Sequence, residues 1–249
     1  MVARKLGRMG LGCLTLSLCF MLAFPDTAGA VKIVLDAGHG GYNPGAISPR
    51  GLMEKDVNLD ITLRLRDRLE ELGYEVALTR VSDVDISLQQ RVNFATSVNG
   101  DLFVSIHAND YPDPSVSGSL VLYYDRDYPQ AAYPPSKAMA DLTPESKRLA
   151  ELVADSLSKT AGIVNRGLVP SAAYVGRMGS MPSILVETAF LSNYEDEKRL
   201  SDPAFRQAVA MGIAEGIFLY RPTYILQEGD FRDLPSIHWA YQPVMKLKE

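Results

Sequence analysis

The sequence predicts an α/β fold, in the form of a single three-layer domain whose mostly parallel central sheet is flanked by helices. Apolar, β-branched runs stand at 31–35, 102–106 and 183–186. Stretches with helical periodicity separate these runs, and continuous apolar runs of this length are typical of buried strands in a parallel sheet. The chain of 249 residues is long enough to bury one core of this size.

Residues 1–30 have the features of a secretory signal peptide. Three basic residues within the first eight precede an apolar stretch at 11–24, and Ala28-Gly29-Ala30 forms a small-residue cleavage site. The apolar stretch is too short and too weakly flanked for a membrane span. We therefore expect a secreted protein that begins at Val31 and has no transmembrane segment after cleavage.

Composition narrows the possible metal ligands and partners. Both cysteines, Cys13 and Cys19, lie within residues 1–30, so the exported chain has no thiolate ligand and no disulfide. The formal net charge is −5 and becomes more negative without residues 1–30. An acidic protein is poorly suited to sequence-independent binding of nucleic acid, which depends on Lys and Arg against phosphate. We expect a monomer with no nucleic-acid partner.

The region after the first apolar run predicts a helix and a second strand. A loop rich in Gly and Pro comes first, and Asp56 is placed to cap a helix that Gly73 ends. A strand at 74–79 follows this helix. The apolar residues at helical spacing, which are expected to face the core, are Ile61, Leu65, Leu69 and Leu72.

A second helix and two further strands come next. Ser87 and Gln90 have the spacing of a capping box, which opens a helix that stops at Gly100. The residues of this helix that are expected to face inward are Leu88, Val92 and Ala95. The strand at 102–106 follows, and a Pro-rich turn separates it from a strand at 119–124.

The second half of the domain begins with a segment of low periodicity. Residues 125–142 hold three prolines and are expected to form a surface loop. Thr143-Pro144 has the form of a cap followed by a first-turn proline, for a helix that Gly162 ends. Its inward-facing residues are expected to be Leu149, Leu152, Val153 and Leu157. Residues 163–182 look like short strand pieces broken by Gly and Pro.

A strand and a helix close the domain. The strand is expected at 183–190, and Asp202-Pro203 opens the last helix. Its apolar face is expected to consist of Phe205, Val209, Ile213 and Ile217. We expect the domain to span residues 31–221, followed by a short linker at 222–230.

Polar residues stand just past the ends of three predicted strands. These residues are His39, His107 and Glu187. Because the carboxyl ends of parallel strands meet at one edge of a sheet, where ligand sites form, we expect the three side chains to lie close together. With Glu54 from the loop, they make two imidazoles and two carboxylates. That set matches a catalytic zinc site, which has three protein ligands, an open water position and a general base.

Structural explanations exist for some of these residues. The Gly cluster around His39 is also explained by a tight turn, and it matches neither a dinucleotide-binding fingerprint nor a phosphate-binding P-loop. Glu54 and Asp56 both suit the first turn of a helix, so spacing alone does not choose the ligand. A carboxylate at Glu187, directly after a buried apolar run, is costly unless it is paired or near a metal, which favours a functional role.

Several segments resemble a known family. They are Asp36-Ala37-Gly38-His39-Gly40-Gly41, Pro44-Gly45-Ala46, Glu54-Lys55-Asp56, Leu78-Thr79-Arg80, Ser105-Ile106-His107-Ala108-Asn109, Glu145-Ser146-Lys147, Asn165-Arg166-Gly167, Met181-Pro182 and 186–193. In this order, over about residues 32–220, they are similar to the zinc-dependent N-acetylmuramoyl-L-alanine amidases. The resemblance implies that His39, Glu54 and His107 bind Zn²⁺ and that Glu187 acts in catalysis. The resemblance therefore favours Glu54 over Asp56 as the third zinc ligand.

The resemblance implies a peptidoglycan hydrolase, located outside the cell or in the cell wall. It would cleave the amide bond between N-acetylmuramic acid and L-alanine with zinc-activated water and Glu187 as general base. Asp36 and Asn109 are expected to orient the imidazoles. Asn43 stands where the family often has Asp. The alternatives are a zinc peptidase acting within the stem peptide and a non-catalytic wall-binding protein, which the retention of all four site residues disfavours.

The tail has a resemblance of its own. Phe231-Arg232-Asp233-Leu234-Pro235 and His238-Trp239-Ala240-Tyr241 look like the opening of an S-layer homology motif. Such motifs hold exported proteins to secondary cell-wall polysaccharide. Residues 231–249 contain only the start of the motif, and a segment of about 19 residues is too short to build a core of its own. We therefore expect this truncated motif not to anchor the protein.

Overall fold

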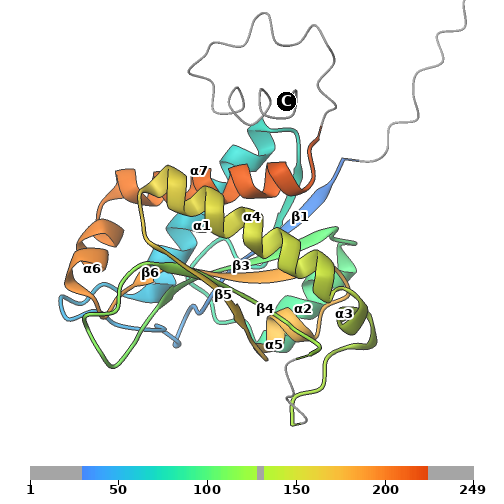
Figure 1. The fold of residues 1–249 in the computed structure, drawn as a ribbon, viewed down its shortest axis with the longest axis horizontal. Helices are drawn as coiled ribbons and strands as arrows, with labels where there is room; N and C mark the ends of the chain where they lie inside the picture. The colour runs from blue at the N-terminus through green and yellow to red at the C-terminus, as the bar shows by residue number, and fades with distance from the viewer. Residues whose placement is uncertain (1–29, 128–131, 224–249) are drawn as a thin grey trace, which may run out of the picture.

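The computed structural model describes residues 30–127 and 132–223. Within these residues one sheet forms, with helices on both of its faces (Figure 1). Its elements are β1 (Lys32–Ala37), α1 (Glu54–Glu71), β2 (Glu75–Leu78), α2 (Leu88–Ser97), β3 (Leu102–Asn109), β4 (Ser119–Tyr123), α3 (Lys137–Asp141), α4 (Thr143–Ala161), β5 (Asn165–Pro170), α5 (Tyr174–Arg177), β6 (Ser183–Phe190), α6 (Tyr194–Ser201) and α7 (Pro203–Tyr220). The expected signal peptide, most of the linker and the tail motif lie outside the described residues.

The sheet is mostly parallel, as predicted. Its strand order is β2-β1-β3-β6-β4-β5, and β2, β1, β3 and β6 run in one direction. The strand β4 is antiparallel to β6, and β5 is parallel to β4. The starts of β4 and β5 therefore lie at the same edge of the sheet as the ends of β1, β3 and β6, an arrangement that the sequence did not predict.

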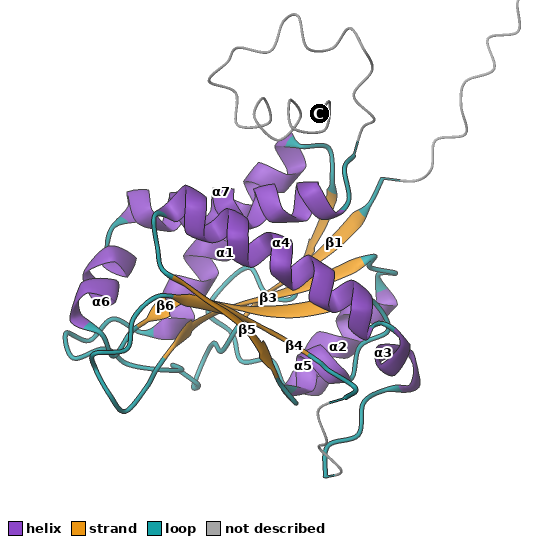
Figure 2. Cartoon of the chain, in the orientation of Figure 1, coloured by secondary structure: helices purple, strands orange, loops and turns teal. Residues whose placement is uncertain are grey.

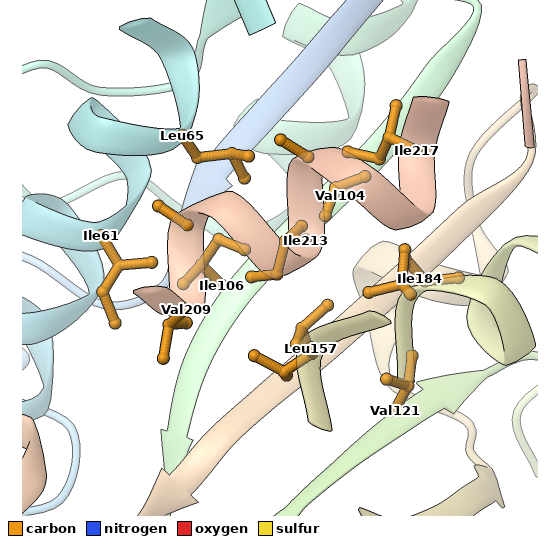
Figure 3. Packing of buried hydrophobic residues seen from close by; sticks show 14 of the residues in the cluster. Ile61, Leu65, Val104, Ile106, Val121, Leu157, Ile184, Val209, Ile213 and Ile217 are labelled. Carbon is orange, nitrogen blue, oxygen red and sulfur yellow. The ribbon is translucent and has the colours of Figure 1, made fainter. Parts of the chain in front are cut away.

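Helices cover both faces of the sheet, so the predicted three layers are present (Figure 2). One face packs against α1, α4 and α7, and the other packs against α2 and α5. In the larger core, Ile61 and Leu65 of α1 and Ile213 of α7 lie fully buried against the sheet (Figure 3). Each fully buried aliphatic side chain of this size contributes about 1.5–3 kcal/mol relative to exposure.

The two helices at the start of the domain differ in part from expectation. Asp56 does not cap α1, because the helix begins at Glu54 and its N-cap residue Met53 makes no side-chain hydrogen bond. The carbonyls of the preceding loop accept the first helical N–H groups instead, at 2.9 Å for Glu54 and 3.0 Å for Lys55. The capping box of Ser87 is confirmed, but Leu88 is 54% exposed because it occupies the first position of α2.

The segment expected to be a loop at 125–142 contains the short helix α3. Ser136 caps this helix by accepting a hydrogen bond from the backbone N–H of Met139, whose side chain is fully buried. Five residues are too few to show helical periodicity in a sequence. Thr143 lies inside α4 and does not cap it, whereas Asp202 caps α7 as predicted.

The described helices differ from membrane-spanning helices in length or in apolar character. Within residues 30–127 and 132–223, none combines the length and the apolar character that spanning a membrane requires.

Candidate metal centre and active site

Three predicted ligands converge at the carboxyl edge of the sheet. One donor atom from each of His39, Glu54 and His107 lies within 4.8 Å of the others. The His39 Nε2 atom is 3.1 Å from Glu54 Oε2, and the His107 Nδ1 atom is 2.8 Å from Glu54 Oε1. Glu187 lies beside them, because β3 and β6 pair His107 with Glu187. The structure therefore brings together all four residues that the sequence indicated.

His39 is positioned by the loop that follows β1. Its backbone is in the left-handed region, with φ 60°, which is uncommon for residues other than Gly. Its Nδ1 atom is 3.0 Å from Asn43 Oδ1, and the N–H of Gly45 donates to the same oxygen. Asn43 Oδ1 is thus an acceptor for the Nδ1 proton, and the tautomer that uses it would leave the Nε2 lone pair for a metal ion.

His107 is positioned by the sheet itself. It lies near the end of β3, and its ring is packed closely against the backbone of Gly38. A Cβ atom at Gly38 would lie 2.3 Å from both Cε1 and Nε2 of His107, so only Gly leaves room for the ring. Burial alone would lower the pKa of His107, but the hydrogen bond with Glu54 and the charge of Glu187 raise it above the ordinary value.

Glu54 is a buried carboxylate at the first position of α1. Its oxygens accept hydrogen bonds from the backbone N–H groups of Ala46 and Ala108 and from the side chain of Asn58. Burial would raise the pKa of Glu54, but the hydrogen bonds with His107 and His39 keep it well below the ordinary value. The group is therefore an anion held in a fixed orientation, as a metal ligand must be.

Glu187 has the most unusual environment of the four. It lies in β6 and is partly buried, and its Oε2 atom is fully buried without a hydrogen-bond partner. Burial raises the pKa of Glu187 to about 7, with the nearby imidazoles opposing the rise and the charge of Glu54 adding to it. An unpartnered carboxylate oxygen is costly in an apolar interior and indicates a functional group.

These observations fit a zinc ion. Two imidazole nitrogens and one anionic carboxylate face a common point, which is a donor set that zinc prefers. Asn43 and Asn58 hold the donors from behind, as outer partners do at metal sites.

The hydrogen bonds of Asp36 and of the Asn109 oxygen go to groups other than the imidazole rings. The Asp36 carboxylate accepts hydrogen bonds from Thr79, Arg91 and Ser105. The side-chain oxygen of Asn109 accepts one from the backbone N–H of Asp110. A role for either residue in orienting the imidazoles therefore stays a prediction.

A buried arginine connects Asp36 to the metal-binding loop. Arg91 donates to Asp36 Oδ1 at 2.6 Å, to the carbonyl of Ala37 at 2.7 Å and to the carbonyl of His39 at 2.8 Å. Arg80 donates to the carbonyls of Ala37 and Gly38. The sequence analysis missed Arg91, and although it noted Arg80 and Asn43 as family positions, it did not predict their contacts with this loop. For Arg91 an indication existed, because it lies on the inward face of α2 beside Val92 and Ala95.

The fold and the site together define a class: α/β proteins with a His-Glu-His cluster that could hold a metal ion, and an adjacent carboxylate, at the carboxyl edge of a mainly parallel sheet. A family model described as N-acetylmuramoyl-L-alanine amidase matches residues 33–218. The chain belongs to the N-acetylmuramoyl-L-alanine amidase family.

Curated relatives and solved structures agree with this assignment. The chain is 42% identical over 188 residues to the amidase LytC of Bacillus subtilis, covering 76% of this chain and 35% of LytC. It is 38% identical over 226 residues to AmiC of Neisseria meningitidis, covering 79% of this chain and 54% of that protein. The chain thus spans between a third and about half of the length of these relatives.

The fold is shared with solved amidases. AmiC2 of Nostoc punctiforme superposes with a TM-score of 0.67 at 40% identity, covering 77% of this chain and 97% of that structure. The catalytic domain of CwlV from Bacillus (Paenibacillus) polymyxa var. colistinus gives a TM-score of 0.67 at 33% identity, covering 76% and 97%. These structures confirm the predicted fold class.

Proposed function

We propose that this chain is a zinc-dependent amidase that cleaves the bond between N-acetylmuramic acid and the L-alanine of the stem peptide in peptidoglycan. Family membership supports the reaction. The observation that carries the mechanism is the buried, unpartnered Oε2 of Glu187 beside the converging donors of His39, Glu54 and His107.

The metal would be held by His39 Nε2, His107 Nδ1 and the Glu54 carboxylate. Bound zinc supplies Lewis-acid chemistry, because it lowers the pKa of water and polarises the amide carbonyl. The chain keeps its donors ready for this role. Asn43 fixes the His39 tautomer, and Asn58 and the Ala46 N–H fix the carboxylate.

Glu187 acts as the general base and then as the general acid. Its carboxylate takes a proton from the attacking water and delivers a proton to the amine of L-alanine as the amide bond breaks. A pKa of about 7 suits this exchange, since a group that both accepts and donates works best near the ambient pH. No group among the described residues donates a hydrogen bond to Oε2, so none competes there with a proton on the carboxylate.

Digestion of purified peptidoglycan tests the proposal. We expect new free amines on L-alanine with intact glycan strands, identified by mass spectrometry. New amines inside the stem peptide would indicate a peptidase, and absence of any product would indicate a wall-binding protein. His107→Ala should lower both zinc content and activity, because His107 is a ligand.

The variant Glu187→Gln separates a base from a ligand. It keeps the size of the side chain but cannot accept the proton of water, so activity should fall by about 10²–10⁴-fold. Zinc content after dialysis, measured by elemental analysis, should stay equal to that of the unmodified protein. If Glu187→Gln loses zinc, Glu187 is a ligand and the assigned role is wrong.

We also propose the following organisation around the catalytic domain at 31–221. Residues 1–30 direct export to the cell wall or the outside of the cell, 222–230 form a linker, and 231–249 do not anchor the monomeric protein. Deleting residues 223–249 should leave hydrolysis nearly unchanged. Pull-down on S-layer-type walls should be equal with and without them. Clear loss of wall binding would mean that the tail binds wall polysaccharide.

A further inference from the structure

An exposed arginine lies at the catalytic edge of the sheet, two strands from Glu187. Register places His107 of β3, Glu187 of β6 and Leu120 of β4 side by side across three neighbouring strands. In the next strand, Ser119 pairs with Asn165 and Val121 pairs with Leu168, so two residues of β5 stand opposite Leu120. Those residues are Arg166 and Gly167, which form a β-bulge.

The bulge is held in a defined conformation. The side-chain oxygen of Asn165 accepts a hydrogen bond from the Gly167 N–H at 2.8 Å, and its amide donates to Asp155 at 3.1 Å. Gly167 has φ +88°, which L side chains rarely adopt. Bulges at sheet edges next to active sites commonly redirect a side chain. Here the bulge sets the direction of Arg166.

The Arg166 guanidinium is fixed but has no acidic partner. It donates to the carbonyl of Ser117 at 3.1 Å, and its Cζ atom lies 5.9 Å from the centroid of the Phe190 ring. It forms no ion pair within residues 30–127 and 132–223. Arg50, Arg64 and Arg91, in contrast, each face a carboxylate. Arg166 is exposed, so most of its five N–H donors face solvent.

We propose that Arg166 binds the free α-carboxylate of the second residue of the stem peptide, the D-glutamate that follows L-alanine. This inference rests on the proposed function, and it adds a substrate-specificity residue. In the stem peptide this D-glutamate is joined onward through its side chain, so its α-carboxyl group is either free or amidated. A fixed guanidinium distinguishes these two forms, because it forms charge-assisted hydrogen bonds only with the carboxylate.

The spacing agrees with this assignment. Two interstrand spacings, one on each side of β4, separate β6 from β5 by about 10 Å. Two extended peptide residues span about 7 Å. The contact with Phe190 shows that the Arg166 side chain reaches across β4 to β6, the strand that carries Glu187. A peptide that runs from Glu187 across Leu120 therefore presents its second residue to Arg166.

Binding of two soluble muramyl tripeptides tests the proposal. The tripeptides differ only in whether the α-carboxyl of D-glutamate is free or amidated, and calorimetry uses zinc-loaded Glu187→Gln protein, so that cleavage does not interfere. We expect the free form to bind about 10- to 100-fold more tightly. Adding Arg166→Gln should remove this preference and leave the affinity for the amidated form unchanged, whereas Arg166→Lys should retain part of it.

The matched control is Arg148→Gln. Arg148 is also exposed and stacks on an aromatic ring, with Cζ 5.7 Å from the centroid of Tyr220, but it lies in α4. Its loss should leave the preference unchanged. The proposal is overturned if the parent protein shows no preference, or if Arg166→Gln weakens both ligands equally. Hydrolysis by the unmodified enzyme is measured separately, so failure of the proposed activity is distinguishable from failure of this subsite.

Discussion

The two histidines of the His39-Glu54-His107 cluster are fixed in different ways. His39 lies in a loop with a left-handed backbone, and hydrogen bonds from Arg91 and to Asn43 hold it in place. His107 lies in a central strand, and the pairing of β3 with β6 sets its position against Gly38. The position of His39 depends on a buried polar network, whereas the position of His107 depends on sheet register and close packing.

This difference predicts which substitutions would displace each histidine. Removing one charged member of a buried polar network destabilises the folded state, because the remaining partner is left buried without a counter-charge or hydrogen bond. A closely packed ring is displaced when a neighbouring side chain gains volume, because the surrounding backbone has little freedom to move. Substitutions in the two regions therefore differ in effect.

The largest expected effect comes from Arg91→Met. Asp36 is 1% exposed and Arg91 is 3% exposed, so the variant leaves a buried charge unpaired. Breaking one side of such a pair costs about 3–5 kcal/mol. We expect the free energy of unfolding, measured with urea at pH 7, to fall by that amount. Arg66→Met removes an exposed pair with Asp67 and should change it by less than about 1 kcal/mol. Equal losses would contradict the network argument.

A pH-dependent effect is expected on the His107 side, in protein stripped of metal. The pKa of Glu187 is about 7 in the folded state against an ordinary 4.5, so the folded state holds the proton more tightly. Its contribution to stability is present below pH 4.5 and is lost as pH rises through about 7. At about 1.4 kcal/mol per pH unit, the loss is about 3 kcal/mol. Urea unfolding should show this loss relative to Glu187→Gln, and parallel pH curves would refute it.

Gly38→Ala tests the packing of His107. The added methyl group would lie 2.3 Å from the ring, so the imidazole must leave its position. Displacement of a catalytic group by about 1 Å can cost about 100-fold in rate. We expect kcat/KM for peptidoglycan fragments to fall by about that factor. Gly176→Ala is the control, because nothing lies within 4 Å of its added Cβ. Full activity of Gly38→Ala would show that the ring is not confined.

The smallest expected effect concerns Asn43. Asn43→Ala removes the acceptor opposite His39 Nδ1, which should weaken zinc affinity by about tenfold. Asn43→Asp keeps the acceptor and adds negative charge, so zinc affinity should equal or exceed that of the unmodified protein. Competition with a chelator measures both. The orienting role would be rejected if Ala and Asp at this position gave the same affinity.

Much of the fold was predictable because its rules are local. Apolar runs predicted β1, β3 and β6, and the capping box at Ser87 predicted the start of α2. The reversed direction of β4 was not predictable, because it depends on which strand β4 meets across the sheet. The helix α3 was not predicted because it is too short to show helical periodicity. The burial of Met139, which stabilises it, is visible only in the folded chain.

The sequence predicted the main side chains of the site, but it did not predict the hydrogen bonds that hold them in position. His39, His107 and Glu187 follow apolar runs, which sequence shows directly. The bond between Arg91 and Asp36 joins residues 55 positions apart, and only the folded chain brings them together. Asn43 was noticed as a departure from the family pattern, but its contact with His39 needs the loop geometry.

The antiparallel direction of β4 places the loop between β3 and β4 at the edge of the sheet that carries the site, where its length and sequence can be changed by protein engineering. The connection from β3 to β4, residues 110–118, opens at the catalytic rim, away from the packed core. Doubling the length of a flexible loop costs only about 0.6 kcal/mol. Grafts at this connection can therefore change the approach to the rim, while the loop after β1, the start of α1 and β3 keep His39, Glu54 and His107 in place. In this architecture, the loop that borders the rim can vary in sequence separately from the elements that hold the His39-Glu54-His107 cluster.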